Sequence, residues 1–221
     1  MQKIKTSHYD ILFSNQNSSF INDIIFKNKY SKVFILVDSN TKKYCLKLFL
    51  KKHLSEIKTQ LITIKKGEEN KNTKSLHSIW IKISKLGGDR NSLLINLGGG
   101  MISDLGGFVA STYNRGIDFI NIPTTLLSMV DASIGGKVGI NIEKLKNMVG
   151  VFNYPKLILI DTSFLQTLPK RELKSGFGEM LKHGLIFDKK YFKRLSELKN
   201  INSKLNNELI YTSIKIKNEI V

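Results

Sequence analysis

The sequence predicts an α/β protein built on a doubly wound parallel sheet and followed by helices. Up to about residue 160, short apolar runs alternate with stretches of helical periodicity, which is typical of strand–helix–strand units. One run leads directly into Gly98-Gly-Gly100 and a helix, as at the carboxyl end of a parallel strand. After Asp161 three helical stretches follow without a strand. We therefore expect an α/β domain over residues 1–160 and the beginning of a helical domain over residues 161–221.

The expected strands are short runs rich in aliphatic and β-branched residues, bounded by polar or glycine turns. In chain order they lie at 33–37, 61–64, 92–97, 119–122 and 157–160. The expected helices have apolar residues three and four positions apart, which places these residues on one helix face. They lie at 41–54, 76–86, 102–112, 171–187, 189–199 and 203–219. The last helix meets no glycine or proline stop, so we expect it to belong to a longer protein. Isolated from that protein, the chain would expose the apolar faces of the helices over 171–219, which predicts poor solubility.

Composition excludes several classes of protein. The 35 basic and 18 acidic residues give a formal charge of +17, but residues 98–160 hold only five basic and four acidic residues. The positive charge therefore lies outside the glycine-rich segment, and a nucleic-acid-binding function is not favoured. Cys45 is the single cysteine, which excludes an internal disulfide and fits a reducing compartment. The absence of a long apolar run and of an apolar leader predicts a cytoplasmic protein that does not enter a membrane.

The glycine turn 98–100 and Asp38 both follow predicted strands. Glycines at such a turn let a phosphate approach the backbone, and the following helix supplies free N–H groups. The spacing is not Gly-x-Gly-x-x-Gly, and ordinary tight turns also produce glycine runs. The sequence therefore allows either a phosphate-binding turn or a purely structural one. Asp38 is either ordinary turn chemistry or the acid that holds an adenosine ribose. Asp104, in the predicted helix, is either a helix N-terminal charge or a site residue.

Glu179, Lys182 and His183 share one face of a predicted helix. The first two form either a surface ion pair or a carboxylate metal ligand beside a substrate-binding lysine. A metal held by Glu179 and His183 is less favoured, since an ion needs three or four ligands. The other histidines, His8, His53 and His77, lie far away in sequence and are not expected to be ligands.

The segment 123–141 favours a functional role over a plain scaffold. It combines paired threonines, an acid, a Gly-Gly turn and a lysine in an otherwise apolar run. Burying Asp131 and Lys137 there would be costly without partners or ligands. We expect both side chains to serve a site.

Taken together, the motifs resemble the 3-dehydroquinate synthase family of sugar-phosphate cyclases, over about residues 30–187. The matching motifs, in the family's order, are Gly98-Gly-Gly-x-x-x-Asp104, Gly107-Phe-Val-Ala-Ser-Thr-Tyr-x-Arg-Gly116, Pro123-Thr-Thr-Leu-Leu-x-Met-Val-Asp131, Ser133-Ile-Gly-Gly-Lys137, Lys146-Asn147, Thr167-Leu-Pro-x-Arg-Glu172 and Gly178-Glu-x-x-Lys182. Iron-dependent alcohol dehydrogenases share parts of this pattern. The resemblance implies a Rossmann-like domain that binds NAD, then a helical domain that binds a metal and the substrate.

The resemblance also implies an activity. The family converts 3-deoxy-arabino-heptulosonate 7-phosphate to 3-dehydroquinate and phosphate in the shikimate pathway. NAD oxidises a ring hydroxyl, phosphate is eliminated, the ketone is reduced again, and an intramolecular aldol reaction closes the carbocycle. The protein mainly positions and polarises the reactants. A related cyclase that makes an inosose or a valiolone, and a non-catalytic NAD-binding remnant, are the alternatives.

Residue by residue, the resemblance implies three groups. Those expected to bind NAD are Asp38, Glu68, Lys71, Gly99, Gly100, Met101, Ile102, Ser103, Asp104, Thr124, Thr125, Lys137, Lys146, Phe164 and Thr167. Those expected to contact substrate are Arg115, Asp131, Lys137, Asn147 and Lys182, with Arg115 reaching the phosphate across a homodimer interface. Glu179 is expected to bind a divalent metal, zinc or cobalt. The family's two histidine ligands lie in a further segment of more than a hundred residues.

Overall fold

The computed structural model describes residues 2–14, 20–54, 57–198, 200–201, 205 and 207–220. Its main sheet runs in the order β1-β2-β9-β6-β5-β3-β4, and only the β1–β2 pair is antiparallel. The strands are β1 (Lys3–Lys5), β2 (Asp10–Phe13), β3 (Lys32–Asp38), β4 (Gln60–Ile64), β5 (Ser92–Gly98), β6 (Asp118–Pro123) and β9 (Leu157–Ile160). The predicted parallel sheet is thereby confirmed.

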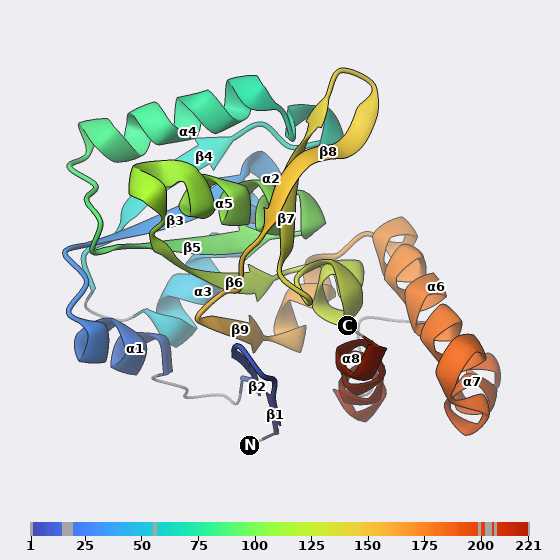
Figure 1. The fold of residues 1–221 in the computed structure, drawn as a ribbon. Helices are drawn as coiled ribbons and strands as arrows, with labels where there is room; N and C mark the ends of the chain where they lie inside the picture. Colours follow the sequence, from blue (N-terminus) through green and yellow to red (C-terminus); the bar gives the residue numbers. More distant parts are fainter. Residues whose placement is uncertain are drawn as a thin grey trace.

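Helices cover both faces of this sheet (Figure 1). One face carries α4 (Thr73–Lys85), α5 (Gly100–Thr112) and the hairpin of β7 (Lys137–Ile142) and β8 (Leu145–Phe152). The other carries α1 (Phe20–Asn28) and α3 (Leu46–His53), and the short α2 (Ser39–Tyr44) follows β3. Central strands are buried on both sides: in β3, Ile35 belongs to one core cluster and Phe34 to the other. This double burial explains why these strands read as continuous apolar runs.

Three helices follow the last strand and stand beside the carboxyl ends of the strands (Figure 1). They are α6 (Lys170–Phe187), α7 (Lys189–Ser196) and α8 (Asn207–Ile220). Short helical turns complete the described chain: η1 (Glu68–Asn70), η2 (Tyr113–Arg115), the π-helical η3 (Ser128–Ala132) and η4 (Thr162–Thr167). Leu185, Ile186 and Phe187 at the end of α6 are exposed, in line with the expected apolar surface. Among the described residues, no helix has both the length and the apolar character needed to cross a membrane.

The order of the strands locates the place where a ligand binds in such a sheet. The chain passes from β3 to β4 on one side, then crosses to β5 on the other side of β3. In open α/β sheets, ligands bind at the carboxyl ends of the strands where the order reverses. Here that position lies between the ends of β3 and β5, at Asp38 and Gly98.

A buried ion network ties helix α3 to the end of β9. Asp161 Oδ2 lies 2.9 Å from Lys52 Nζ and 3.0 Å from His53 Nε2, and its Oδ1 accepts hydrogen bonds from the backbone N–H and hydroxyl of Ser163. Burial alone would raise the pKa of Asp161, but these partners outweigh it and lower the pKa well below the usual value. His53 is fully buried here, which explains its presence in an apolar helix face.

Every predicted strand and helix has a counterpart in the structure, with two qualifications. The predicted helix 41–54 is divided at Cys45 into α2 and α3, and residues 199, 203, 204 and 206 of the predicted last helices lie outside the described residues. The sequence analysis missed β1, β2, α1 and the β7–β8 hairpin. Strand β1 has a single buried residue between two exposed lysines, and β2 begins with an aspartate, so neither gives an apolar run of four residues.

Candidate functional site

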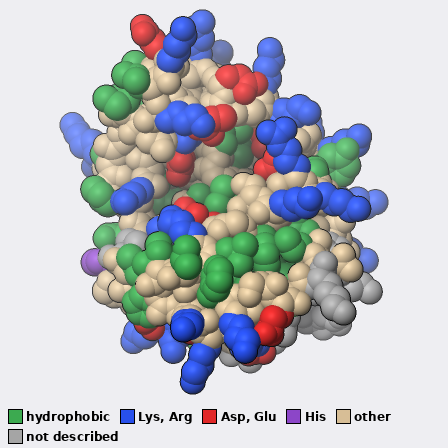
Figure 2. Space-filling view, turned by 90° about the vertical axis from the view of Figure 1, so that its right-hand side faces the viewer, with side chains coloured by type: hydrophobic (Ala, Val, Ile, Leu, Met, Phe, Trp, Pro, Cys, Tyr) green, Lys and Arg blue, Asp and Glu red, His purple; other side chains and the backbone are tan. Residues whose placement is uncertain are grey.

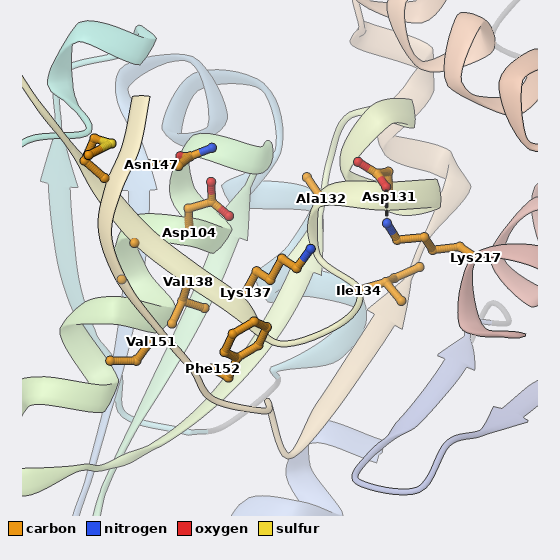
Figure 3. A pocket seen from close by; sticks show the side chains of 13 residues that line it. Asp104, Asp131, Ala132, Ile134, Lys137, Val138, Asn147, Val151, Phe152 and Lys217 are labelled. Atoms are coloured by element: carbon orange, nitrogen blue, oxygen red, sulfur yellow. Dashed lines mark ion pairs between the residues drawn. The ribbon is translucent and has the colours of Figure 1, made fainter. Parts of the chain in front are cut away.

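A cavity of about 480 Å³ opens at the carboxyl ends of the strands, between the hairpin and helix α8. Figure 2 looks at this side of the molecule, where lysines and carboxylates surround a hollow. Polar side chains line the cavity together with apolar ones from β7 and β8 (Figure 3). The charged and amide groups are Asp104, Asp131, Lys137, Asn147 and Lys217. A site of this size with few, convergent polar groups has the character of a small-molecule site.

Lys71 is the buried centre of an ion network at one wall of the cavity. Its Nζ lies 2.9 Å from Asp104 Oδ2, 2.9 Å from Glu68 Oε1 and 2.6 Å from Asn147 Oδ1. Burial raises the pKa of Asp104 to about 6, although Lys71 counteracts this. For Lys71, burial lowers the pKa, but Asp104 and Glu68 outweigh it and raise the value. The network joins three residues expected to bind NAD to Asn147, which is expected to bind substrate.

Asn141 fastens the hairpin to this network. Its side-chain amide donates to Glu68 Oε1 at 2.9 Å, its backbone N–H donates to Lys71 O at 2.8 Å, and its Oδ1 accepts from the backbone N–H of Asn147. Asn147 itself has φ +56°, a left-handed conformation that asparagine tolerates better than most residues. The sequence analysis did not single out Asn141.

The glycine turn forms an uncapped helix N-terminus. Gly99 is the N-cap of α5 and provides no side-chain hydrogen bond to the first N–H groups of the helix. A Cβ at Gly99 would lie 3.1 Å from Thr125 Cγ2, and one at Gly100 would lie 3.0 Å from Ala132 Cβ. A side chain at either position would therefore pack tightly against its neighbour. The turn also leaves N–H donors and the positive dipole end available to an anion.

Asp38 has a structural role that the sequence analysis had left open. Its Oδ1 accepts from the backbone N–H groups of Asn40 and Thr41, and Thr41 Oγ1 accepts from the Asp38 N–H, which completes a capping box. Beside it, the buried Cys45 thiol is hydrogen-bonded to Thr124 and Thr167. Burial raises the pKa of Cys45 to about 11, so the thiol is protonated at neutral pH. Asp38 at the end of β3, Thr124 directly after β6 and Thr167 at the end of η4 thus come to one place.

Glu179, Lys182 and His183 lie on the face of α6 that is turned toward η3 and α8. Glu179 Oε1 is 2.7 Å from Lys182 Nζ and 3.4 Å from His183 Nε2. The hydrogen bond to Glu179 raises the pKa of Lys182, whereas burial lowers that of His183. The ligand atoms of Asp131, Glu179 and His183 all lie within 4.8 Å of one another. The structure thus adds a third group to the pair that the sequence analysis considered too small for a metal.

Lys217 is a cavity residue that the sequence analysis missed. Its Nζ lies 2.7 Å from Asp131 Oδ1, as the dashed line in Figure 3 shows. It follows the buried Ile210 and Ile214 at helical spacing, so a lysine in the apolar stripe of α8 was the available signal. Asp131 is half-buried and Lys137 is exposed, and both side chains line the cavity.

The remaining predicted residues occupy several places. Arg115 is exposed in η2, which precedes β6 and therefore lies away from the carboxyl ends of the strands. Lys146 is exposed on β8, and Met101 and Thr125 are half-buried at the glycine turn. The side chains of Ile102, Ser103 and Phe164 are buried inside the fold, so any ligand contact there would involve the backbone.

Comparison with known sequences gives consistent matches. A family model described as 3-dehydroquinate synthase N-terminal matches residues 61–175. The 3-dehydroquinate synthase of Parabacteroides distasonis is 42% identical over 221 residues, which cover 97% of this chain and 61% of the relative. That of Endomicrobium trichonymphae is 41% identical over 224 residues, covering 99% and 62%. The chain therefore spans about 60% of the length of these relatives.

Solved structures match over nearly the whole chain as well. The 2-epi-5-epi-valiolone synthase from Streptomyces hygroscopicus subsp. jinggangensis 5008, with NAD+ and Zn2+ bound, is similar with a TM-score of 0.81 and 26% identity, covering 99% of this chain and 61% of that one. A 2-deoxy-scyllo-inosose synthase complexed with carbaglucose-6-phosphate, NAD+ and Co2+ gives a TM-score of 0.80 at 22% identity, with the same coverage. The second match supports the fold alone.

Proposed function

This chain belongs to the 3-dehydroquinate synthase family, and we propose that it forms part of an enzyme that converts 3-deoxy-arabino-heptulosonate 7-phosphate to 3-dehydroquinate and phosphate. In this proposal residues 1–160 form the NAD-binding domain and residues 161–221 begin the helical domain. The enzyme is a cytoplasmic homodimer of the shikimate pathway. The observation that carries the proposal is the cavity, where the nucleotide-site residues and the cationic residues meet.

NAD fits the carboxyl-end loops of the sheet. Its pyrophosphate would meet the uncapped N-terminus of α5 at Gly99, Gly100 and Met101, where no side-chain cap occupies the first N–H groups of the helix. Its adenosine end would lie toward Asp38, Glu68 and Lys71, and the nicotinamide toward Asp104. Thr124 and Thr125 would line the cofactor cleft. When bound, NAD supplies a temporary acceptor for the hydride of a ring carbon and returns it later. Lys71 and Asp104 fix each other, which keeps this wall rigid around the cofactor.

The cationic side of the cavity suits a sugar acid phosphate. Lys137 and Lys217 supply two positive charges, while Asn147 and Asp131 can hydrogen-bond hydroxyl groups. Lys182, tied to Glu179, would contact the substrate from α6. Arg115 is exposed and lies away from the carboxyl ends of this chain's strands. In a dimer it would contact the phosphate of the substrate that is bound to the other subunit. Together these residues would orient one substrate against the nicotinamide.

A divalent metal such as zinc or cobalt fits beside the substrate positions. Glu179 would be a ligand, and the nearby carboxylate and imidazole form a donor set that these ions accept. When bound, the ion polarises substrate oxygens and favours loss of a proton from a hydroxyl. The side chains around the ion would position the substrate next to the nicotinamide ring.

Two other functions have support from particular observations. The valiolone and inosose synthases share this fold, so a different cyclic product is the first alternative. The identities of 41–42% to 3-dehydroquinate synthases, against 22–26% to those two enzymes, favour the main proposal. A chain that binds NAD without turnover is the second alternative, since it spans only about 60% of its relatives.

Two measurements test the proposal. Calorimetric titration of this chain with NAD tests the cofactor site and is expected to show one site. Phosphate release is then measured with 3-deoxy-arabino-heptulosonate 7-phosphate, NAD and Zn2+ or Co2+, with heptulose and glucose phosphates as controls. Release from the heptulosonate alone supports the synthase, and release from a control sugar supports the first alternative. NAD binding without release supports the second, and absence of NAD binding contradicts all three.

A further inference from the structure

Four residues beside the cavity form a closed circuit of hydrogen bonds. Glu68 Oε1 accepts from Lys71 Nζ and from Asn141 Nδ2, each at 2.9 Å. Lys71 Nζ also donates to Asn147 Oδ1 at 2.6 Å, and the backbone N–H of Asn147 donates to Asn141 Oδ1 at 2.9 Å. Glu68 and Lys71 belong to η1 and its carboxyl end, whereas Asn141 and Asn147 belong to β7 and β8. We call these four residues the hairpin clamp.

The chemistry of the partners determines how both asparagine amides are turned. The Lys71 ammonium only donates, so Asn147 must present Oδ1 to it and keeps both Nδ2 hydrogens for another partner. An ionised carboxylate only accepts and a backbone N–H only donates, so Asn141 must turn Nδ2 to Glu68 and Oδ1 to Asn147. Reversing the Asn141 amide would place two acceptors together and two donors together. A carboxylate at this position would lack the donor, and a hydrocarbon would lack both groups.

The hairpin depends on Asn141 because its own ladder is interrupted at this point. The pairing of β7 with β8 shifts register between Ile140 and Ile142, where Asn141 stands. The backbone N–H of Asn141 donates to Lys71 O at 2.8 Å rather than to β8. Across the hairpin, Asn147 has φ +56°, a conformation less favourable than extended backbone. Irregular strand positions of this kind redirect side chains beside sites, and this one directs the Asn141 amide to the Asn147 backbone.

Asn147 is the member of the hairpin clamp that lines the cavity. The two Nδ2 hydrogens that Lys71 leaves available suit an oxygen atom of a phosphate, a carboxylate or a hydroxyl group. Glu68 and Lys71 lie on the side where the nucleotide is proposed to bind. Asn141 connects these two sides, because it bonds to Glu68 with one end of its amide and to Asn147 with the other.

We propose that Asn141 is a positioning residue that couples the two sides of the site. It holds Asn147 in place for the sugar phosphate and ties it to the nucleotide side at Glu68 and Lys71. This inference rests on the proposed function for the ligand of each side, and it adds a residue that acts only through its neighbours. NAD that engages Glu68 and Lys71 would fix the hairpin clamp before the sugar phosphate binds. NAD should therefore raise the affinity for the sugar phosphate, and the sugar phosphate that for NAD.

The first test needs no ligand. Amide hydrogen exchange of the 221-residue chain, followed by NMR, measures the protection of the Asn147 N–H. We expect Asn141→Ala to speed its exchange at least tenfold, whereas Asn141→Asp keeps an acceptor and should leave the rate within about threefold. Asn153→Ala is the matched control, because the Asn153 amide follows the hairpin but donates to Ser111 Oγ. An Asn147 N–H that exchanges equally slowly in Asn141→Ala, with unchanged circular dichroism, overturns the proposal.

The second test measures the coupling itself. Calorimetry gives the affinity of each preparation for 3-deoxy-arabino-heptulosonate 7-phosphate, first without NAD and then with saturating NAD. We expect NAD to raise this affinity at least fivefold in wild type and Asn153→Ala, and less than twofold in Asn141→Ala and Asn141→Asp. The affinity for NAD alone should stay within threefold in all of them. A merely structural effect of Asn141 would lower both affinities together and leave the ratio unchanged.

The outcomes separate this inference from the proposed function. A wild-type chain that binds neither NAD nor the sugar phosphate contradicts the proposed function, and hydrogen exchange then still decides whether Asn141 positions Asn147. Binding of both ligands with a coupling that persists in folded Asn141→Ala contradicts this inference alone. Binding of both ligands without coupling in wild type does the same.

Discussion

The Nζ atom of Lys217 lies 2.7 Å from Oδ1 of Asp131. This contact joins α8, near the end of the described chain, to η3 at the carboxyl end of β6, and both side chains line the cavity. A lysine in this position neutralises the carboxylate in the absence of a ligand and can turn to an anionic ligand when one enters. The helices after residue 161 therefore contribute directly to the site at the end of the sheet.

Substitution Lys217→Gln is expected to weaken binding of 3-deoxy-arabino-heptulosonate 7-phosphate at least tenfold while leaving the NAD affinity within twofold. The variant loses one of the two lysines that line the cavity in the described part of the chain, whereas Lys71 and Asp104 lie at the other wall. Calorimetry with NAD present measures the first effect, and NAD titration alone measures the second. Lys215→Gln, on the exposed face of the same helix, is the matched control. An equal loss in both lysine variants would assign the effect to overall charge.

Substitution Gly99→Val is expected to lower the NAD affinity at least tenfold. Even a Cβ at this position lies 3.1 Å from Thr125 Cγ2, and a larger side chain would cover the first N–H groups of α5. The control is Gly178→Ala, because a Cβ there has no atom within 4 Å. Alanine at this helical position should stabilise the protein by about 0.5–1 kcal/mol. Unchanged NAD binding by Gly99→Val would place the pyrophosphate elsewhere.

Asp104 should make stability depend on pH in an unusual direction for a carboxyl group. Its pKa is raised to about 6 from 3.8, so the folded protein retains a proton that the unfolded chain has lost within that interval. Stability due to this group therefore falls as the pH rises from about 4 to about 6, by about 1–3 kcal/mol. Urea unfolding of wild type and Asp104→Asn at pH 4 and pH 7 measures the difference. A difference that does not change with pH would show that Lys71 keeps Asp104 ionised throughout.

Asp161 should act in the opposite sense. Its pKa is lowered because His53, Ser163 and Lys52 stabilise the carboxylate, so its contribution is present above about pH 4 and is lost as the pH falls below that value. Asp161→Asn removes the negative charge that two basic side chains face, and we expect it to lower the free energy of unfolding by about 3 kcal/mol at pH 7. Chemical unfolding of wild type and Asp161→Asn at pH 7 and pH 3 checks this. The difference between their free energies of unfolding should be smaller at pH 3. The exposed pair of Lys193 and Glu197 offers the control, as Glu197→Gln should change stability by less than 1 kcal/mol.

Short apolar runs were sufficient to predict the central strands because these strands are buried on both faces. The same signal could not reveal β8, whose eight residues are all exposed and whose partner β7 starts inside the glycine-rich segment. The family resemblance implied Lys71, Asp104 and Asn147 individually, but their mutual contacts depend on hairpin closure by Asn141, which no local pattern indicates. The Asp131–Lys217 pair spans 86 positions and is produced by tertiary packing alone.

The segment between β1 and β2 connects the amino-terminal region of the chain to the turn beside the cavity. Tyr9 lies just before β2, and its hydroxyl accepts the backbone N–H of Gly135 at 2.9 Å, in the turn that leads to Lys137. The neighbouring His8 stacks on Tyr154, which follows the hairpin. Residues near the start of the sequence thus support the floor of a pocket formed more than a hundred positions later. A shortened amino terminus or a bulky fusion there would disturb ligand affinity before it disturbed the central sheet, although no cavity residue had been changed.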